Sequence, residues 1–239
     1  MDTSRALNVA LLGHGKMGKL IAQLAAQRGM QVQQILRSGT NHEGAGITEH
    51  SFQGIDVCLD FTTSAAVVEN IRRVAGCGCN LVVGTTGWYD RLDAVREIIE
   101  RAGVGMVYAP NFSLGVQLFY RVARAAAEIF SGFPTFEPYL TETHHQFKKD
   151  APSGTALELK REVEPYLRDR ALPISSVRAG YFPGMHEFGF DSEVETLLVR
   201  HTVRTRQVFA EGALYAARWV AGRKGLYRFA DILQVEEVA

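Results

Sequence analysis

The sequence is short of cysteine, of net charge and of long hydrophobic runs. Only Cys58, Cys77 and Cys79 are present, and this odd number at these spacings fits neither a disulfide framework nor a four-ligand zinc site. Lys plus Arg and Asp plus Glu both number 26, so no global field favours nucleic acid or an anionic membrane surface. No apolar stretch approaches the roughly 18 residues of a membrane span. These absences predict reduced thiols and a protein that binds neither nucleic acid nor membrane, and we expect no metal ion.

The length and composition are those of a globular protein. A chain of 239 residues, 46% of them apolar, suffices for one large or two modest domains with a core. The first strand is expected within about seven residues of Met1, which leaves no room for a signal peptide. We therefore expect a cytoplasmic protein.

A glycine motif follows the first expected strand. Leu7–Leu12 is a short apolar run, typical of a buried strand, and it leads into Gly13-His-Gly-Lys-Met-Gly18 and then a helical pattern. This is the G-x-G-x-x-G fingerprint of dinucleotide binding in the strand–helix context that it requires. Gly13 would allow the tight turn, Gly15 the approach of a pyrophosphate, and Gly18 the packing of helix on strand.

Strands and helices then alternate through the first half. Further strands are expected over 32–36, 55–61, 80–83 and 104–108, with helices over about 65–77, capped by Ser64, and over about 90–101. This alternation predicts an α/β fold, a Rossmann-type doubly wound parallel sheet with right-handed crossovers.

The loops at the expected strand ends are rich in small and hydroxylated residues. In parallel sheets, ligands bind at the carboxyl ends of the strands, and such residues let a ribose and a nicotinamide lie against the backbone. The candidate cofactor-binding residues in these loops are Gly13, Gly15, Lys16, Met17, Gly18, Phe61, Thr62, Gly84, Thr85, Thr86, Ala109, Pro110, Asn111 and Phe112.

Arg37 bears on the choice of nucleotide. NAD-binding folds usually place an acidic residue after the second strand to hold the ribose hydroxyls, but this chain has Arg37 there and no carboxylate before Glu43. A guanidinium suits a 2′-phosphate by charge and geometry. The sequence therefore favours NADPH, or use of both NADPH and NADH; the alternative is that Arg37 is only a solvated strand-end residue.

The second half contains a dense cluster of ionisable residues within 142–155. His144 and His145 can exchange protons near neutral pH, and Lys148 supplies positive charge or a proton. Ser153, Gly154 and Thr155 at a helix start present backbone N–H groups that suit a carboxylate. The cluster predicts a site for an anionic small molecule with proton transfer beside it. Taken singly, the same residues could be a solvated loop and a helix cap.

The pattern around this cluster indicates a second domain of α+β type. Helices are expected over 114–130, 156–167 and 206–221, strands over 135–143, 176–180, 186–190 and 195–203, and a turn with the end segment over 222–231. His186 and His201 lie on expected strands and are interpreted as structural, with His186 the better candidate for a pocket rim.

The chain resembles the 4-hydroxy-tetrahydrodipicolinate reductase (dihydrodipicolinate reductase) family of lysine and diaminopimelate synthesis. The resemblance spans nearly the whole chain. It rests on GHGKMG, DFT at 60–62, GTTG at 84–87, APNFS at 109–113, E-x-HH-x-x-K-x-DAPSGTA at 142–156 and R-x-G…H at 178–186. One departure is a glycine loop one residue shorter than in many members, with Lys16 where an arginine often stands.

The resemblance implies an NAD(P)H-dependent oxidoreductase that reduces a cyclic imine dicarboxylate. It implies a dinucleotide-binding domain over 1–110, rejoined by 214–239, and a substrate and oligomerisation domain over 111–213. His144 resembles the proton donor/acceptor and Lys148 its partner donor. His145, Gly154 and Thr155 match positions that hold the substrate carboxylates, with the Ser153 amide beside them. Members are usually homotetramers.

Two other functions remain open at this stage. Another dehydrogenase of amino or imino acids, such as aspartate dehydrogenase, would keep the glycines without needing the histidine and lysine motif. A nucleotide-sensing protein without catalysis would be expected to lose the His144 and Lys148 pair or to carry a basic DNA-binding module, and neither is evident.

Overall fold

The computed structural model describes residues 5–233, which form two compact units. One unit contains the chain up to Phe112 and again from Phe209 onwards, and the other is Ser113–Val208. The boundaries expected from sequence were 110 and 214. No helix among the described residues has the length and apolar character needed to cross a membrane.

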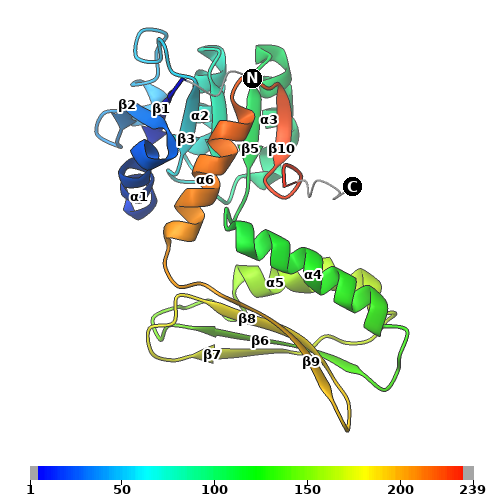
Figure 1. Cartoon of the computed structure of the whole chain (residues 1–239). Coiled ribbons are helices and arrows are strands. Elements are labelled where there is room, and N and C mark those ends of the chain that lie inside the picture. The colour runs from blue at the N-terminus through cyan, green and yellow to red at the C-terminus, as the bar shows by residue number, and fades with distance from the viewer. Residues whose placement is uncertain (1–4, 234–239) are drawn as a thin grey trace. The chain divides into compact units, whose positions relative to one another are not determined.

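The first unit is built on a six-stranded sheet in which all paired neighbours run parallel (Figure 1). The strand order is β10-β5-β4-β3-β1-β2. The strands are β1 (Leu7–Leu12), β2 (Met30–Leu36), β3 (Val57–Asp60), β4 (Asn80–Val83), β5 (Gly105–Tyr108) and β10 (Gly225–Arg228). The expected Rossmann-type sheet is thus confirmed.

Helices cover both faces of this sheet. Helices α1 (Lys16–Ala25) and α6 (Gln207–Val220) share one hydrophobic cluster with Val9 and Leu11 of β1. Helices α2 (Val67–Gly76) and α3 (Leu92–Ala102) share the other with Ala10 and Leu12. Alternate residues of a strand point to opposite faces, so a strand covered on both sides is apolar throughout. Short 3₁₀ turns lie at Ala26–Arg28, His42–Gly44, Tyr89–Arg91 and Glu164–Tyr166.

Two local expectations for the first unit were wrong. Residues 222–231 were expected to be a turn and an end segment, but they contain β10, which adds an edge strand beside β5. Ser64 was expected to cap α2, but Ala66 is the N-cap and no side chain caps that end. Ser64 instead accepts a hydrogen bond on its carbonyl oxygen from Arg91.

The second unit is a mixed four-stranded sheet with two helices on one face. The strand order is β7-β6-β8-β9, with β6 parallel to β7 and antiparallel to β8. The elements are α4 (Leu114–Phe130), β6 (Glu137–His144), α5 (Gly154–Val163), β7 (Ile174–Arg178), β8 (Met185–Asp191) and β9 (Thr196–Thr202). Figure 1 shows α4 and α5 along one side of this sheet.

Strand β6 sets up the candidate site of this unit. Its buried residues alternate with more exposed ones, and Leu140 joins the core that α4 and α5 cover. Glu142 and His144 follow on the same face, because side chains two apart in a strand point the same way. The apolar face of β6 therefore ends in a buried carboxylate and a buried imidazole.

Candidate active site

The three motif glycines differ in the space around them. A Cβ at Gly13 would lie 2.4 Å from the carbonyl oxygen of Phe61, and a Cβ at Gly18 would lie 2.1 Å from the carbonyl oxygen of Gly13. Both positions therefore exclude side chains. A Cβ at Gly15 would meet nothing within 4 Å, so the backbone there is open to a ligand.

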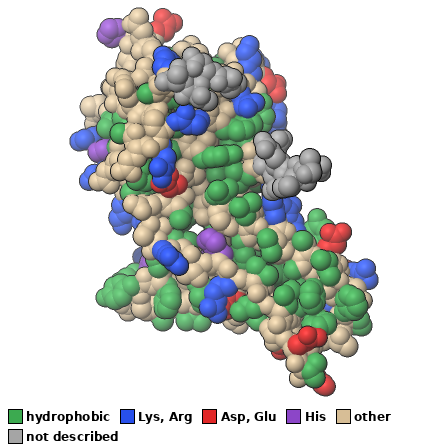
Figure 2. Space-filling model, viewed as in Figure 1, with side chains coloured by type: hydrophobic (Ala, Val, Ile, Leu, Met, Phe, Trp, Pro, Cys, Tyr) green, Lys and Arg blue, Asp and Glu red, His purple; other side chains and the backbone are tan. Residues whose placement is uncertain are grey.

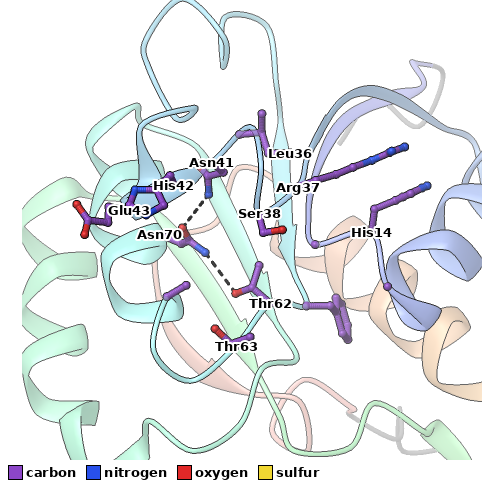
Figure 3. Close-up of a pocket in the computed structure, with 14 residues that line it drawn as sticks. His14, Leu36, Arg37, Ser38, Asn41, His42, Glu43, Thr62, Thr63 and Asn70 are labelled. Atoms are coloured by element: carbon purple, nitrogen blue, oxygen red, sulfur yellow. Dashed lines mark hydrogen bonds between the residues drawn. The ribbon is translucent and has the colours of Figure 1, made fainter.

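A cavity of about 580 Å³ lies beside this loop. Figure 3 shows His14 of the glycine loop, Arg37 and Ser38 after β2, and Thr62 and Thr63 after β3 around it. Its lining residues are Gly13, His14, Gly15, Leu36, Arg37, Ser38, Asn41, His42, Glu43, Phe61, Thr62, Thr63, Ala66 and Asn70. Except for Leu36 at the end of β2 and Asn70 of α2, these residues lie in the segments that follow β1, β2 and β3, at the edge of the sheet where parallel sheets bind nucleotides.

A buried carboxylate organises the loops around this cavity. Asp60 is completely buried and accepts hydrogen bonds from the Thr62 hydroxyl at 2.6 Å, the Asn70 amide at 2.9 Å and the Thr85 hydroxyl at 3.0 Å. Asn70 also accepts a hydrogen bond from Asn41 and donates one to the Thr62 hydroxyl, as the dashed lines in Figure 3 show. Burial raises the pKa of Asp60, and these hydrogen bonds oppose that rise. Asp60 thus positions two of the candidate cofactor loops.

A second, smaller cavity of about 240 Å³ adjoins the first unit's loops. Phe61 lines both cavities, so the two lie next to each other. The other lining residues are Met17, Gly84, Pro110, Asn111, Phe112 and Phe209. All except Phe209 were candidates from sequence, and the two cavities together suit the two halves of a dinucleotide.

Five candidates line neither cavity. Lys16 and Thr86 are exposed, whereas Gly18, Thr85 and Ala109 are buried. The Thr85 hydroxyl accepts a hydrogen bond from the Thr62 backbone at 2.8 Å and donates one to Asp60, so its observed role is within the protein. Contact of these five residues with nucleotide stays a prediction.

In the second unit, Glu142 is held firmly by one of its oxygens. Its side chain is 0% exposed. Oε1 accepts hydrogen bonds from the Ser153 backbone at 3.0 Å, the Ser176 hydroxyl at 2.7 Å and Arg178 Nη2 at 2.6 Å. Burial alone would raise the pKa of Glu142, but these hydrogen bonds outweigh it and hold the pKa at about 2. Glu142 is therefore a carboxylate at neutral pH.

The other oxygen, Oε2, faces two imidazoles. His144 Nδ1 lies 3.0 Å from it and His186 Nε2 lies 3.6 Å from it. Although the first of these distances is short, the two atoms lack the alignment of a formed hydrogen bond. His186 Nε2 is also 3.0 Å from the Ser153 hydroxyl. Burial is the main cause that lowers the pKa of both histidines, to about 4 for His186.

This cluster predicts a specific loss of stability in acid. Burial lowers the pKa of His186 to about 4 in the folded protein, from 6.5 in the unfolded chain. As the pH falls, the unfolded chain therefore binds the proton first. The free energy of unfolding should decrease between pH 6.5 and 4, by at most about 3 kcal/mol from this group. Urea titrations across that range measure it. His186→Gln should make the decrease shallower, and an exposed control, His50→Gln, should not; equal slopes in all three proteins would contradict the assignment.

Lys148 is paired in this structure with Asp150. Both carboxylate oxygens of Asp150 lie 2.7 Å from Lys148 Nζ, although Asp150 is largely exposed. Arg178 Nη2 donates to the Asp150 backbone oxygen at 2.6 Å as well as to Glu142. Arg178 therefore connects the buried carboxylate to the loop that carries Lys148.

The start of α5 divides the roles of its three candidate residues. Ser153 is buried and is the N-cap, with its hydroxyl accepting from Ala156 N at 3.2 Å. Ser153 thus has the helix-cap role that the sequence left open as an alternative. Gly154 is exposed, with open space where a Cβ would be, and Thr155 is half-buried. The helix N-terminus at Gly154 is therefore accessible to an anion. His145 lies half-buried on the adjoining loop.

Sequence reasoning missed most of the network around His144. Glu142 and Arg178 were noted only as letters of a motif, Ser176 only within a strand, and His186 was interpreted as structural. The strand register brings them together, since Glu142 is paired with His186 on β8 and with Ser176 on β7. A carboxylate and a histidine on the apolar faces of alternating strands were the available signal.

The fold, the loops around the first unit's cavities and the Glu142–His144 cluster of the second unit are typical of an NAD(P)-dependent oxidoreductase with two domains. Residues 7–112 match the description "Dihydrodipicolinate reductase, N-terminus", and residues 115–233 match "Dihydrodipicolinate reductase, C-terminus". The chain belongs to the dihydrodipicolinate reductase family.

Relatives and a solved structure agree with this assignment over nearly the full length. The chain is 31% identical to the 4-hydroxy-tetrahydrodipicolinate reductase of Christiangramia forsetii, covering 95% of this chain and 98% of that one. It is 33% identical to that of Methanosarcina acetivorans, covering 95% and 99%. Dipicolinate-bound dihydrodipicolinate reductase from Paenisporosarcina sp. TG-14 superposes with a TM-score of 0.81 at 25% identity, covering 95% and 99%.

Proposed function

We propose that this protein reduces 4-hydroxy-tetrahydrodipicolinate to tetrahydrodipicolinate with NADPH or NADH, in the synthesis of lysine and diaminopimelate. The observation that carries the proposal is that both halves of the chain match the two halves of one reductase family. The relatives just described are named for this reaction. These matches favour the reductase over another imino-acid dehydrogenase or a nucleotide sensor.

The chemistry assigns a task to His144. Loss of water from 4-hydroxy-tetrahydrodipicolinate gives a conjugated cyclic imine. When bound, the reduced nicotinamide would supply a hydride to a ring carbon of this imine, and an acid must then protonate the electron-rich ring. His144 is 7% exposed at the end of β6, and its Nε2 is the nitrogen remote from Glu142. We assign His144 the proton transfer, with Lys148 as a second donor.

The second task is to hold two carboxylates. Lys148, His145 and the accessible N-terminus of α5 at Gly154 and Thr155 supply charge and N–H groups within one loop region. In the structure, both carboxylate oxygens of Asp150 accept hydrogen bonds from Lys148 Nζ, as a substrate carboxylate would. Binding of the dicarboxylate then requires it to compete with Asp150 for Lys148.

The choice between NADPH and NADH is a separate proposal that rests on Arg37. Arg37 lines the large cavity, and its guanidinium has no ion-pair partner among residues 5–233. Arg37→Asp should weaken NADPH binding by about 10- to 100-fold, because one charge-assisted hydrogen-bonded contact to the 2′-phosphate is lost. Fluorescence titration of both nucleotides measures the effect, and NADH affinity should change little.

Glu43 provides the matched control, since it lines the same cavity and a carboxylate can hold the ribose hydroxyls of NADH. Glu43→Gln should leave NADPH affinity unchanged. If Arg37→Asp alters neither nucleotide while Glu43→Gln weakens NADH, the preference is set by Glu43 and the assignment of Arg37 fails.

We also propose that the second unit mediates assembly into a homotetramer. Every large hydrophobic side chain that is exposed within residues 5–233, except Tyr215, belongs to this unit. Figure 2 shows such side chains gathered over it. Val177 on β7 and Leu198 on β9 are 46% and 42% exposed, on the sheet face that α4 and α5 leave bare.

A cytoplasmic location stays a prediction from the free thiols.

The function is tested by following nucleotide oxidation at 340 nm. The substrate is generated in the cuvette by the preceding synthase from pyruvate and aspartate semialdehyde. Oxidation that depends on that synthase establishes the reductase. Nucleotide binding without such oxidation would contradict the proposed substrate.

A further inference from the structure

The buried carboxylate of Glu142 has a geometry that the reduction itself does not require. Its two oxygens differ completely in their surroundings. Oε1 accepts all three hydrogen bonds, from α5's N-cap backbone, from β7's Ser176 and from Arg178. Oε2 accepts none and lies 3.0 Å from Nδ1 of His144, close enough for a hydrogen bond to form after a small rotation of the ring. A side chain clamped at one oxygen by three groups has a fixed direction for the other.

The second nitrogen of His144 is unobstructed by the residue opposite it. A Cβ at Gly184, just before β8, would lie only 3.0 Å from His144 Nε2. The absence of a side chain at position 184 keeps that approach open. The imidazole therefore has one nitrogen against a carboxylate and the other beside a position without a side chain.

We propose that Glu142 is a positioning residue for His144: its Oε2 keeps the hydrogen on Nδ1, so that Nε2 is the atom that exchanges the proton with substrate, and Arg178 keeps Glu142 in place. The inference rests on the proposed function for its kinetic readout but not for its structural one. In the reductive step, the hydride and its two electrons come from the nucleotide, and the proton leaves Nε2 of the imidazolium for the ring. The imidazole that remains keeps its Nδ1–H.

The charges around His144 are arranged so that Glu142 favours the protonated form. The ring faces Glu142 on its own strand, Arg178 on β7, His186 on β8, and Lys148 and Asp150 on the following loop. Burial, Lys148 and Arg178 lower the pKa of His144, whereas Glu142 and Asp150 raise it. Removing the charge of Glu142 should thus lower the pKa of His144 further and reduce the supply of imidazolium at neutral pH.

The kinetic test compares Glu142→Gln with Glu137→Gln, the same substitution at an exposed position of the same strand. Glu142→Gln should lower kcat by roughly 10²-fold, leave nucleotide affinity unchanged and move the His144 limb of the pH–rate profile to lower pH. Glu137→Gln should match the wild type. A Glu142→Gln protein whose folded fraction retains the wild-type kcat and pH profile would overturn the proposal.

A measurement on the unsubstituted protein covers the case in which Glu142→Gln does not fold. Nitrogen-15 NMR of labelled histidine distinguishes the two neutral tautomers, and His144→Asn assigns the signal. The proposal expects hydrogen on Nδ1 in the wild type above the pKa of His144; a predominant Nε2–H tautomer would overturn it. This result does not depend on whether the reductase reaction occurs.

A chelation experiment distinguishes the positioning role of Glu142 from a metal-binding role of the same cluster. Glu142, His144 and His186 each offer one donor atom, and these atoms lie within 4.8 Å of one another. Under the proposal, dialysis against EDTA leaves both the tautomer and the activity unchanged. Loss of activity on chelation, restored by Zn²⁺, would show that the cluster serves a metal ion and would overturn the positioning role.

Discussion

Replacing His144 by alanine is expected to lower kcat by roughly 10²- to 10⁴-fold, the usual contribution of a positioned acid or base. Nucleotide affinity should change little, since the nucleotide cavities lie in the other unit. Initial rates with saturating substrate give kcat, and fluorescence titration gives the dissociation constant of NADPH.

Two controls separate lost chemistry from lost folding. His144→Asn retains a polar group beside the buried Glu142 carboxylate, so it should fold as the wild type does and show a comparable loss of kcat. His145→Ala, on the next residue, should raise KM far more than it lowers kcat, because His145 is assigned to carboxylate binding. Wild-type turnover in His144→Ala would remove His144 from the mechanism.

The second large effect concerns the glycine loop, where Gly15→Ala and Gly18→Ala should fail for different reasons. At Gly15, a new methyl group meets no protein atom within 4 Å but occupies the space predicted for the pyrophosphate. Nucleotide affinity should fall by about 10-fold or more, with an unchanged Tm. At Gly18, the methyl group would lie 2.1 Å from the Gly13 carbonyl, so both affinity and Tm should fall, Tm by several degrees.

Gly76→Ala is the matched control, because this α2 glycine also has open space around a Cβ and lines neither cavity. It should lower neither nucleotide affinity nor Tm. Thermal melts with and without NADPH measure both effects together. Undiminished NADPH affinity in Gly15→Ala would contradict the placement of the phosphates at this loop.

The first unit was the more predictable part of the chain because its signals are local. The run Leu7–Leu12 and the glycines after it are adjacent in sequence, and a strand covered on both faces is apolar throughout. Strand β10 was not predicted because it is four residues long and lies at the edge of the sheet, with its residues only half-buried or exposed. The predicted Ser64 cap was wrong because the chain first turns at 63–66, and α2 begins only after that turn.

The second unit shows the limit of local signals. His144 and Lys148 were identifiable because their motif is continuous. The partners of His144 lie far along the chain, with Arg178 and His186 on strands β7 and β8, and only the register of the sheet places them beside Glu142. A polar residue on an apolar strand face, such as Glu142 after Leu140, indicates a buried network but does not identify its partners.

The proposed reduction is tested most directly by following the hydride itself. The reaction is run with NADPH carrying deuterium at both C4 positions of the nicotinamide, with substrate generated by the preceding synthase, and the product is analysed by mass spectrometry. We expect tetrahydrodipicolinate with one carbon-bound deuterium. Product without deuterium, or no product while NADPH remains bound, would contradict hydride transfer to this substrate.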